Sequence, residues 1–72
     1  MEMEELLAPM AGKIMKILVK VGDRINEDDE LLKLDAMKME NPIYAPVSGV
    51  IKDIRVKEND EVEADDLMMI IG

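Results

Sequence analysis

Lys38 lies at the middle of the chain, in the segment DAMKME that spans residues 35–40. A methionine stands on each side of it, Met37 and Met39, and an acidic residue closes the segment at either end. A lysine amine is a nucleophile only after it loses its proton, and a reference pKa of about 10.4 keeps it protonated at neutral pH. The chain has no His that could act as a base. The sequence therefore offers a candidate amine without a group of its own to activate it.

No other set of residues predicts independent catalysis. His and Cys are both absent, which excludes nucleophile–base pairs built on them, disulfides and the common zinc sites. The sequence also lacks a glycine-rich phosphate loop. We therefore expect a non-catalytic chain without a metal site. At this level Lys38 could still be an ordinary solvated lysine, and Met37 and Met39 could be ordinary core residues.

Composition limits the partners and the location that we expect. The 72 residues suffice for one domain, residues 1–72. A net charge of -8 repels nucleic-acid phosphates and anionic lipids, and Tyr44 is the only aromatic residue on which a base could stack. No apolar run approaches the roughly 18 residues of a membrane helix, and residues 1–5 are acidic, unlike a signal peptide. We expect a cytoplasmic protein that neither binds nucleic acid nor inserts into a membrane.

An internal repeat organises the chain. The second half matches the first when it is shifted by 37 residues, which sets Ala45 against Ala8. Beyond the aspartate pairs 28–29 and 65–66 the best alignment shifts by one residue and sets Leu31-Leu32 against Leu67-Met68. Two copies favour a two-fold sandwich over a solenoid, and chance similarity between two β-rich segments is the alternative. Further matched pairs are Pro9 and Pro46, Gly12 and Gly49, Ile14 and Ile51, Ile17 and Ile54, Val19 and Val56, and Asp23 and Asp60.

Each copy has the pattern of short strands separated by turns. Residues 51–57 partly alternate between apolar and polar, as in a half-buried strand, whereas 31–34 and 67–71 are apolar runs typical of buried strands. Gly22 and Asn59 are paired by the repeat and are expected at turns with positive φ. We predict an all-β fold, a flattened antiparallel barrel-sandwich of two four-stranded sheets with internal pseudo-two-fold symmetry.

The core has to form from aliphatic side chains. The hydrophobic fraction is 49%, so the chain is too apolar to remain disordered, yet it has no disulfide or zinc site to reinforce a small domain. Tight packing of Ile, Leu, Val and Met must therefore stabilise it. The predicted core residues are Ile14, Ile17, Val19, Leu32, Leu34, Ile51, Ile54, Val56, Met68 and Ile70.

In the segment around Lys38 the sequence resembles the biotinyl domains of biotin-dependent carboxylases, decarboxylases and transcarboxylases. The motif of that family, Ala-Met-Lys-Met often followed by Glu, matches Ala36 to Glu40. Asp35 stands where the family commonly has Glu, so the carboxylate is kept. Asn59 stands where Gly is frequent, and Asn also tolerates a positive φ. The resemblance extends from about Leu7 to Gly72 through segments 8–12 (APMAG), 19–23 (VKVGD), 45–50 (APVSGV) and 56–60 (VKEND).

The resemblance implies a biotin carboxyl carrier domain with the biotinyl/lipoyl-like fold. Biotin would be attached covalently to Lys38, and Ala36, Met37 and Met39 would complete the cofactor-binding segment that the attaching enzyme recognises. The implied partners are a biotin protein ligase and the biotin carboxylase and carboxyltransferase or decarboxylase subunits between which biotin carries a carboxyl group. Such a lysine has to protrude, unpaired, from a rigid turn.

Two alternatives belong to other functional classes. A lipoyl carrier domain shares the fold and the modified lysine, but such domains usually present Asp-Lys-Ala, whereas Met37 and Met39 flank the lysine here. An unmodified structural barrel-sandwich hybrid domain would tolerate any residue at position 38.

The repeat also predicts where the lysine points. A shift by 37 residues maps Lys38 onto Met1 and onto a position just beyond Gly72, so the chain ends occupy the symmetry mate of the turn between the copies. If the axis relates opposite ends of the sandwich, Met1 and Gly72 lie close together and far from Lys38. A linker or a partner could then hold one end while the lysine visits active sites from the other.

Overall fold

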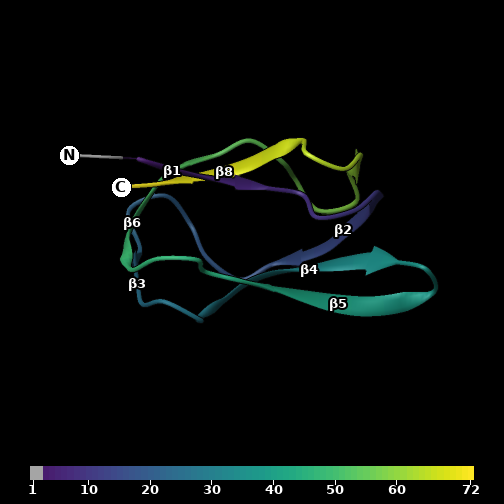
Figure 1. The fold of residues 1–72 in the computed structure, drawn as a ribbon, viewed down its shortest axis with the longest axis horizontal. Helices are drawn as coiled ribbons and strands as arrows, with labels where there is room; N and C mark the ends of the chain where they lie inside the picture. The colour runs from purple at the N-terminus through teal and green to yellow at the C-terminus, as the bar shows by residue number, and fades with distance from the viewer. Residues whose placement is uncertain (1–2) are drawn as a thin grey trace.

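Eight short β-strands and no helix make up residues 3–72, the part of the chain that the computed structural model describes (Figure 1). Apolar residues occur in short runs or alternate with charged ones, and this pattern favours strands. Within residues 3–72 there is accordingly no helix long and apolar enough to cross a membrane. The strands are β1 (Glu4–Leu7), β2 (Gly12–Ile17), β3 (Arg24–Ile25), β4 (Glu30–Ala36), β5 (Met39–Tyr44), β6 (Gly49–Ile54), β7 (Glu61–Val62) and β8 (Leu67–Ile71).

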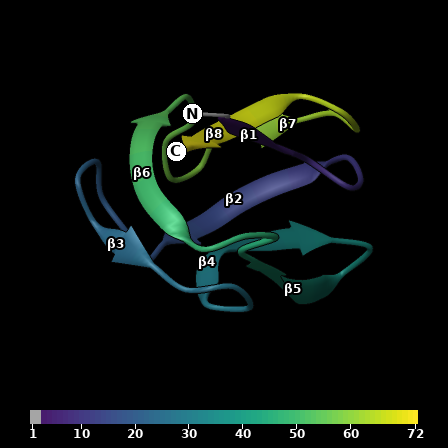
Figure 2. The ribbon, with the colours of Figure 1, turned by 60° about the vertical axis from the view of Figure 1, so that its left-hand side comes forward.

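The strands form two four-stranded sheets in which all neighbours are antiparallel (Figure 2). One sheet has the order β1-β8-β6-β3 and the other the order β5-β4-β2-β7. A shift by 37 residues, as from Gly12 to Gly49, turns β2 into β6, β3 into β7 and β4 into β8, and relates β5 to β1. The predicted all-β barrel-sandwich with pseudo-two-fold symmetry is therefore confirmed.

The repeat keeps one offset throughout. The amide of Leu18 donates to the carbonyl of Leu31 at 2.9 Å, and the amide of Arg55, 37 residues later, donates to the carbonyl of Met68 at 2.8 Å. Leu31 is thus equivalent to Met68, and the predicted one-residue shift, which set Leu31 against Leu67, is wrong. Because both segments are apolar runs, a slip by one residue leaves the sequence similarity intact, and only the backbone hydrogen bonds fix the register.

Left-handed backbone conformations occur at equivalent turns of the two halves. Gly22 has a φ of 97° and Asn59 a φ of 77°, as predicted. Asp28 and Asp65, each with a φ of 73°, form a second pair that the sequence analysis did not identify. Asp tolerates this conformation better than most residues because its short side chain can bond to the nearby backbone.

Aspartate carboxylates close the loops in both halves. Asp23 Oδ2 accepts a hydrogen bond from the amide three residues before it at 2.9 Å. The same contact recurs at Asp60, Asp29 and Asp66, at 2.9, 2.8 and 2.8 Å. Part of the acidic charge therefore serves to satisfy backbone donors in the loops.

The core fills the space between the two sheets. Six of the predicted core residues are buried, namely Ile14, Leu32, Leu34, Ile51, Val56 and Met68. The other four are only partly buried, namely Ile17, Val19, Ile54 and Ile70. Buried apolar residues that the prediction missed are Leu6, Ala8, Ile25, Leu31, Ala36, Ala45, Val62, Met69 and Ile71.

A β-bulge in β2 and in β6 brings Ile17 and Ile54 to the same side of the sheet as Ile14 and Ile51. The pairing of β2 shifts between Ile14 and Lys16, and the pairing of β6 shifts at the equivalent place, just after Ile51. An extra residue in a strand breaks the strict in–out alternation beyond it. Strict alternation would turn Ile17 and Ile54 outward, three residues after Ile14 and Ile51. Because of the bulge both residues pack against the core, where they are partly buried.

The chain ends lie far from the turn between β4 and β5. The molecule is elongated, with principal extents of 36 × 18 × 17 Å. In Figure 1 this turn is at the right-hand end, whereas the C-terminus and the start of β1 are at the left. Glu4 pairs with Ile71 in the sheet. The predicted separation of Gly72 from Lys38 is thus confirmed, and Met1 lies outside the described residues.

Candidate functional site

Lys38 occupies the tip of a tight hairpin. The pairing of β4 with β5 runs from Glu30 opposite Tyr44 to Ala36 opposite Met39, which leaves Met37 and Lys38 as the two residues of the turn. Met37 has a φ of 55° and Lys38 a φ of 61°. A two-residue hairpin loop with positive φ at both positions is the type I′ arrangement, whose twist matches that of the flanking strands.

The residue types in this turn do not favour its backbone. Type I′ turns usually contain Asn, Asp or Gly, because a longer L side chain in the left-handed region is sterically disfavoured. Such a residue costs on the order of 1–3 kcal/mol and persists only where the surroundings hold it in place. The adjoining strands are well placed to do so, since β4 pairs with β5 on one side and with β2 on the other.

Asn41 provides a second support for the turn, and the sequence analysis missed it. Its Nδ2 lies 3.1 Å from the carbonyl oxygen of Met39, 3.2 Å from that of Ala36 and 3.4 Å from that of Leu34. The two nearest carbonyls belong to the residues on either side of the turn. The available signal was a single carboxamide two residues after the motif, in a strand without another amide.

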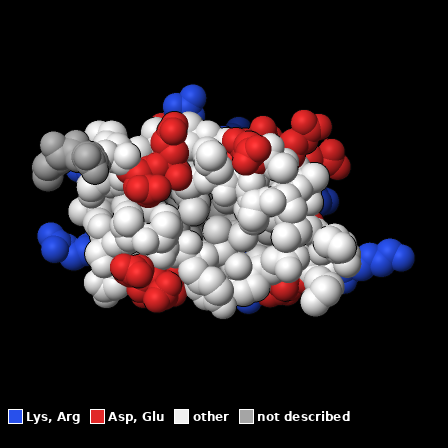
Figure 3. Space-filling view, in the orientation of Figure 1, with Lys and Arg blue, Asp and Glu red and all other residues white. Residues whose placement is uncertain are grey.

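The three residues at the tip are open to solvent. Met37 is 84% exposed and Met39 64% exposed, and Lys38 is also exposed. Among residues 3–72 no partner forms an ion pair or a hydrogen bond with the Lys38 amine. In the space-filling view the corresponding end of the molecule terminates in a basic side chain that extends into solvent (Figure 3). The amine is therefore accessible from several directions.

Ala36 has a different position from the other residues predicted for the site. It is 4% exposed and belongs to the core. A Cβ added at Gly12, on the adjacent strand β2, would lie 3.1 Å from the Ala36 Cβ and 2.6 Å from the carbonyl oxygen of Asp35. The base of the hairpin therefore packs directly against the β2 backbone. Met37, Lys38 and Met39 form the exposed surface, while Ala36 anchors it.

Lys33 provides a contrast within the same hairpin. Its Nζ lies 2.9 Å from Glu40 Oε1 and 3.9 Å from Glu30 Oε2, and its side chain is 34% exposed. The hydrogen bond that Lys33 donates to Glu40, and then the negative charges of Glu40 and Glu30, raise the pKa of Lys33 above its ordinary value. A raised pKa leaves less neutral amine at any pH below it, so Lys33 is a poorer nucleophile and a less accessible one.

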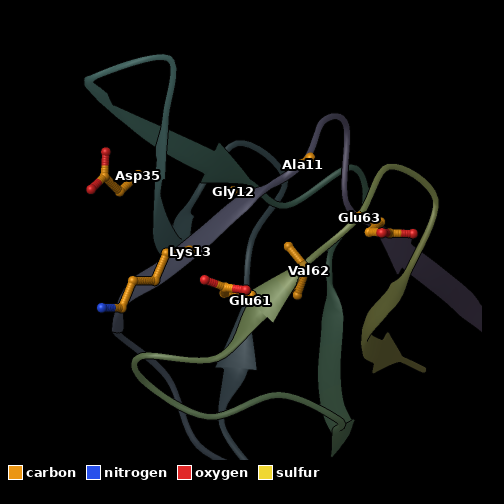
Figure 4. Close-up of a pocket in the computed structure, with 7 residues that line it drawn as sticks. All are labelled: Ala11, Gly12, Lys13, Asp35, Glu61, Val62 and Glu63. Carbon is orange, nitrogen blue, oxygen red and sulfur yellow. The ribbon is translucent and has the colours of Figure 1, made fainter.

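An open groove lies between β2 and β7, beside the base of the hairpin (Figure 4). Its lining residues are Ala11, Gly12, Lys13, Asp35, Glu61, Val62 and Glu63. A second groove is lined by the residues related to these by the 37-residue shift, from Arg24 and Ser48 to Gly72. The pair of grooves is therefore a consequence of the fold. No cluster of potential metal ligands occurs among residues 3–72.

Comparisons with known proteins agree with this geometry. Residues 4–71 match the family model Biotin_lipoyl, described as "Biotin-requiring enzyme". A 36-residue segment, 50% of this chain, is 58% identical to the biotin carboxyl carrier protein of Streptococcus mutans and covers 28% of that protein. A segment of equal length is 56% identical to the gamma subunit of glutaconyl-CoA decarboxylase from Acidaminococcus fermentans and covers 25% of it.

A solved structure extends the similarity to nearly the whole chain. The Kluyveromyces lactis urea carboxylase superposes on 99% of this chain with a TM-score of 0.92 and 34% sequence identity, over 6% of its own length. The matched segments therefore cover about a quarter of these two curated relatives and a small part of that carboxylase. Together with the family match over residues 4–71, these findings show that the chain belongs to the Biotin_lipoyl family, as a biotinyl carrier domain whose cofactor is biotin.

Proposed function

We propose that biotin is attached to Nζ of Lys38 and that the domain carries a carboxyl group between the active sites of a biotin-dependent carboxylase, decarboxylase or transcarboxylase. The observation that carries the proposal is the position of Lys38, exposed and unpaired at the tip of a two-residue turn. Lys33, the other lysine of the hairpin, is half-buried and ion-paired. The residues at the tip fit the group, because the amine is accessible and the rest of the turn leaves it free.

The attachment chemistry requires little of this chain. The Lys38 ammonium first gives up one proton to become the neutral amine. Nζ then displaces the leaving group of an activated biotinyl donor, and a second proton departs as the amide bond forms, so the positive charge of Lys38 is lost. Biotin, once attached, supplies the ureido ring that accepts a carboxyl group at one site and releases it at another. The chain contributes the rigid turn, the exposed thioethers of Met37 and Met39 for recognition by the ligase, and a support that orients the lysine. We infer that the domain itself is non-catalytic.

The partners follow from the same proposal. They are a biotin protein ligase, a biotin carboxylase, and a carboxyltransferase or decarboxylase subunit. The two described ends of the chain lie together, remote from Lys38 (Figure 1). Anything joined to either end would therefore leave the lysine free to enter an active site. On composition alone we propose a cytoplasmic location.

Substitution of the lysine tests the proposal. Lys38→Arg keeps the charge but removes the primary amine, so co-expression with a biotin protein ligase should give no biotinylated protein on a streptavidin blot or by intact-mass spectrometry. Lys33→Arg should be biotinylated like the parent. Biotin on the Lys38→Arg protein, or its absence from the parent, would show the assignment to be wrong. Loading of the parent by a lipoate ligase instead would favour the lipoyl alternative.

A further inference from the structure

The side chain of Asn41 joins the two strands at the point where the lysine turn begins. Its carboxamide nitrogen faces the carbonyl oxygens of Met39 at 3.1 Å, Ala36 at 3.2 Å and Leu34 at 3.4 Å. All three neighbours are acceptors, so only the NH2 group, with two hydrogens to donate, can face them. The two shortest contacts bridge Ala36 and Met39, the pair of residues that closes the turn.

The turn needs such a support. Met37 and Lys38 are both left-handed, at φ 55° and 61°, and neither residue type favours that region. The lysine amine forms no ion pair or hydrogen bond within residues 3–72 that would fix the tip from outside. A carboxamide that bridges the carbonyls on both sides of the turn would limit its motion, because those carbonyls separate when the turn opens.

The internal symmetry shows that the fold itself does not require an amide at this place. The shift of 37 residues relates Asn41 in β5 to Glu4 in β1, which pairs with Ile71 of β8 as Asn41 pairs with Leu34 of β4. Glu4 is exposed. No hairpin turn joins β8 to β1. The half with the lysine turn therefore has the bridging carboxamide, and the half without the turn has a solvated glutamate.

We propose that Asn41 is a positioning residue for acylation of Lys38. It bridges the carbonyls of Ala36 and Met39 and keeps the tip in the single conformation that the ligase binds. This inference rests on the proposed attachment of biotin to Lys38. If the ligase binds only molecules whose turn is ordered, its apparent affinity for the domain falls in proportion to the fraction of molecules with an ordered turn. Loss of Asn41 then raises KM for the domain and leaves kcat unchanged.

Asn41→Ala and Asn41→Asp provide the test. The first removes the donors, and the second places a carboxylate of nearly the same shape against three carbonyl oxygens. With purified biotin protein ligase and saturating co-substrates, we expect Asn41→Ala to raise KM roughly tenfold, the effect of losing two neutral hydrogen bonds. Asn41→Asp should raise it at least as much. Glu4→Ala, at the symmetry-related position, and Pro42→Ala, the next residue of β5, are the matched controls and should leave KM unchanged.

A second readout does not depend on biotin. In the unmodified protein, NMR order parameters of the Met37 and Lys38 amides should fall in Asn41→Ala and stay at the parental level in both controls. Kinetics are measured below the melting transition of every variant, and Asn41→Ser replaces Asn41→Ala if the latter does not fold. An unchanged KM, an unchanged tip order, or an equal rise of KM in Glu4→Ala would overturn the inference. If Lys38→Arg were still biotinylated, the assignment of Lys38 as the attachment site would be wrong. The order parameters of the unmodified protein would still test whether Asn41 holds the turn in place.

Discussion

Truncation of two symmetry-related core residues is the most direct test of how this domain is stabilised. Ile14 in β2 and Ile51 in β6 are both 0% exposed and occupy equivalent positions in the two sheets. Replacing a fully buried Ile by Ala removes apolar contacts and leaves a cavity, at a cost of about 2–5 kcal/mol. In a domain of 60–100 residues each kcal/mol lowers Tm by roughly 4–8 °C. A loss of about 3 kcal/mol therefore lowers Tm by roughly 12–24 °C in Ile14→Ala, and by nearly as much in Ile51→Ala.

Calorimetry or urea unfolding followed by circular dichroism measures both variants against a surface control. Met15, next to Ile14 in the same strand, is 43% exposed, and Met15→Ala should cost less than about 1 kcal/mol. Ile17→Ala should fall between the two, because Ile17 is only partly buried against the core. If Met15→Ala destabilised the domain as much as Ile14→Ala, or if Ile14→Ala and Ile51→Ala differed several-fold, the two sheets would not share one core as described.

Two further predictions concern the hairpin. Gly12→Ala places a Cβ 2.6 Å from the carbonyl oxygen of Asp35, so we expect a loss of more than about 1 kcal/mol in thermal unfolding together with NMR shift changes that reach Lys38. Gly49→Ala, the symmetry mate, should also destabilise the domain but leave the shifts of Lys38 unchanged, and shifts that moved equally in both variants would contradict this account. Glu40→Gln removes the hydrogen-bonded carboxylate that raises the pKa of Lys33, so at pH 8–9, below that pKa, a larger fraction of the amine is neutral and an amine-reactive reagent should label it faster. Mass spectrometry of the labelled peptides checks this, and an unchanged rate at Lys33 would show that the ion pair does not persist in solution.

The sequence was most informative where pattern and symmetry coincided. Two equivalent sheets were predicted from two matched pairs of residues, Gly12 with Gly49 and Gly22 with Asn59. Positions that need a close backbone approach or a positive φ recur when the fold repeats, so they match between the two halves. β1 was missed, since Glu4-Glu5 gives its start a polar pattern although Leu6 is buried.

Other features of the fold and the site depend on three-dimensional contacts that the sequence pattern does not reveal. The bulges of β2 and β6 change the phase of each strand after Ile14 and Ile51, so Ile17 and Ile54 pack partly buried against the core although strict alternation would turn them outward. For the candidate site, the family resemblance predicted a lysine that protrudes from a turn, but nothing in the sequence indicated the role of Asn41. Its carboxamide acquires a function only when the hairpin brings three carbonyl oxygens within reach of it.

The two-fold symmetry separates what the fold needs from what the lysine needs. Features that recur in both halves serve folding: the four loop-closing aspartates, the close approach of Gly12 and Gly49 to a neighbouring strand, and the paired grooves. Features confined to one half have no such explanation. The amide bridge from Asn41 is such a feature, because the equivalent residue, Glu4, is exposed; the bridge supports the turn of Met37 and Lys38, whose residue types disfavour its left-handed backbone. A domain under selection for folding alone would gain nothing from a strained turn of Met and Lys, so the strain itself points to the tip as the working part of the molecule.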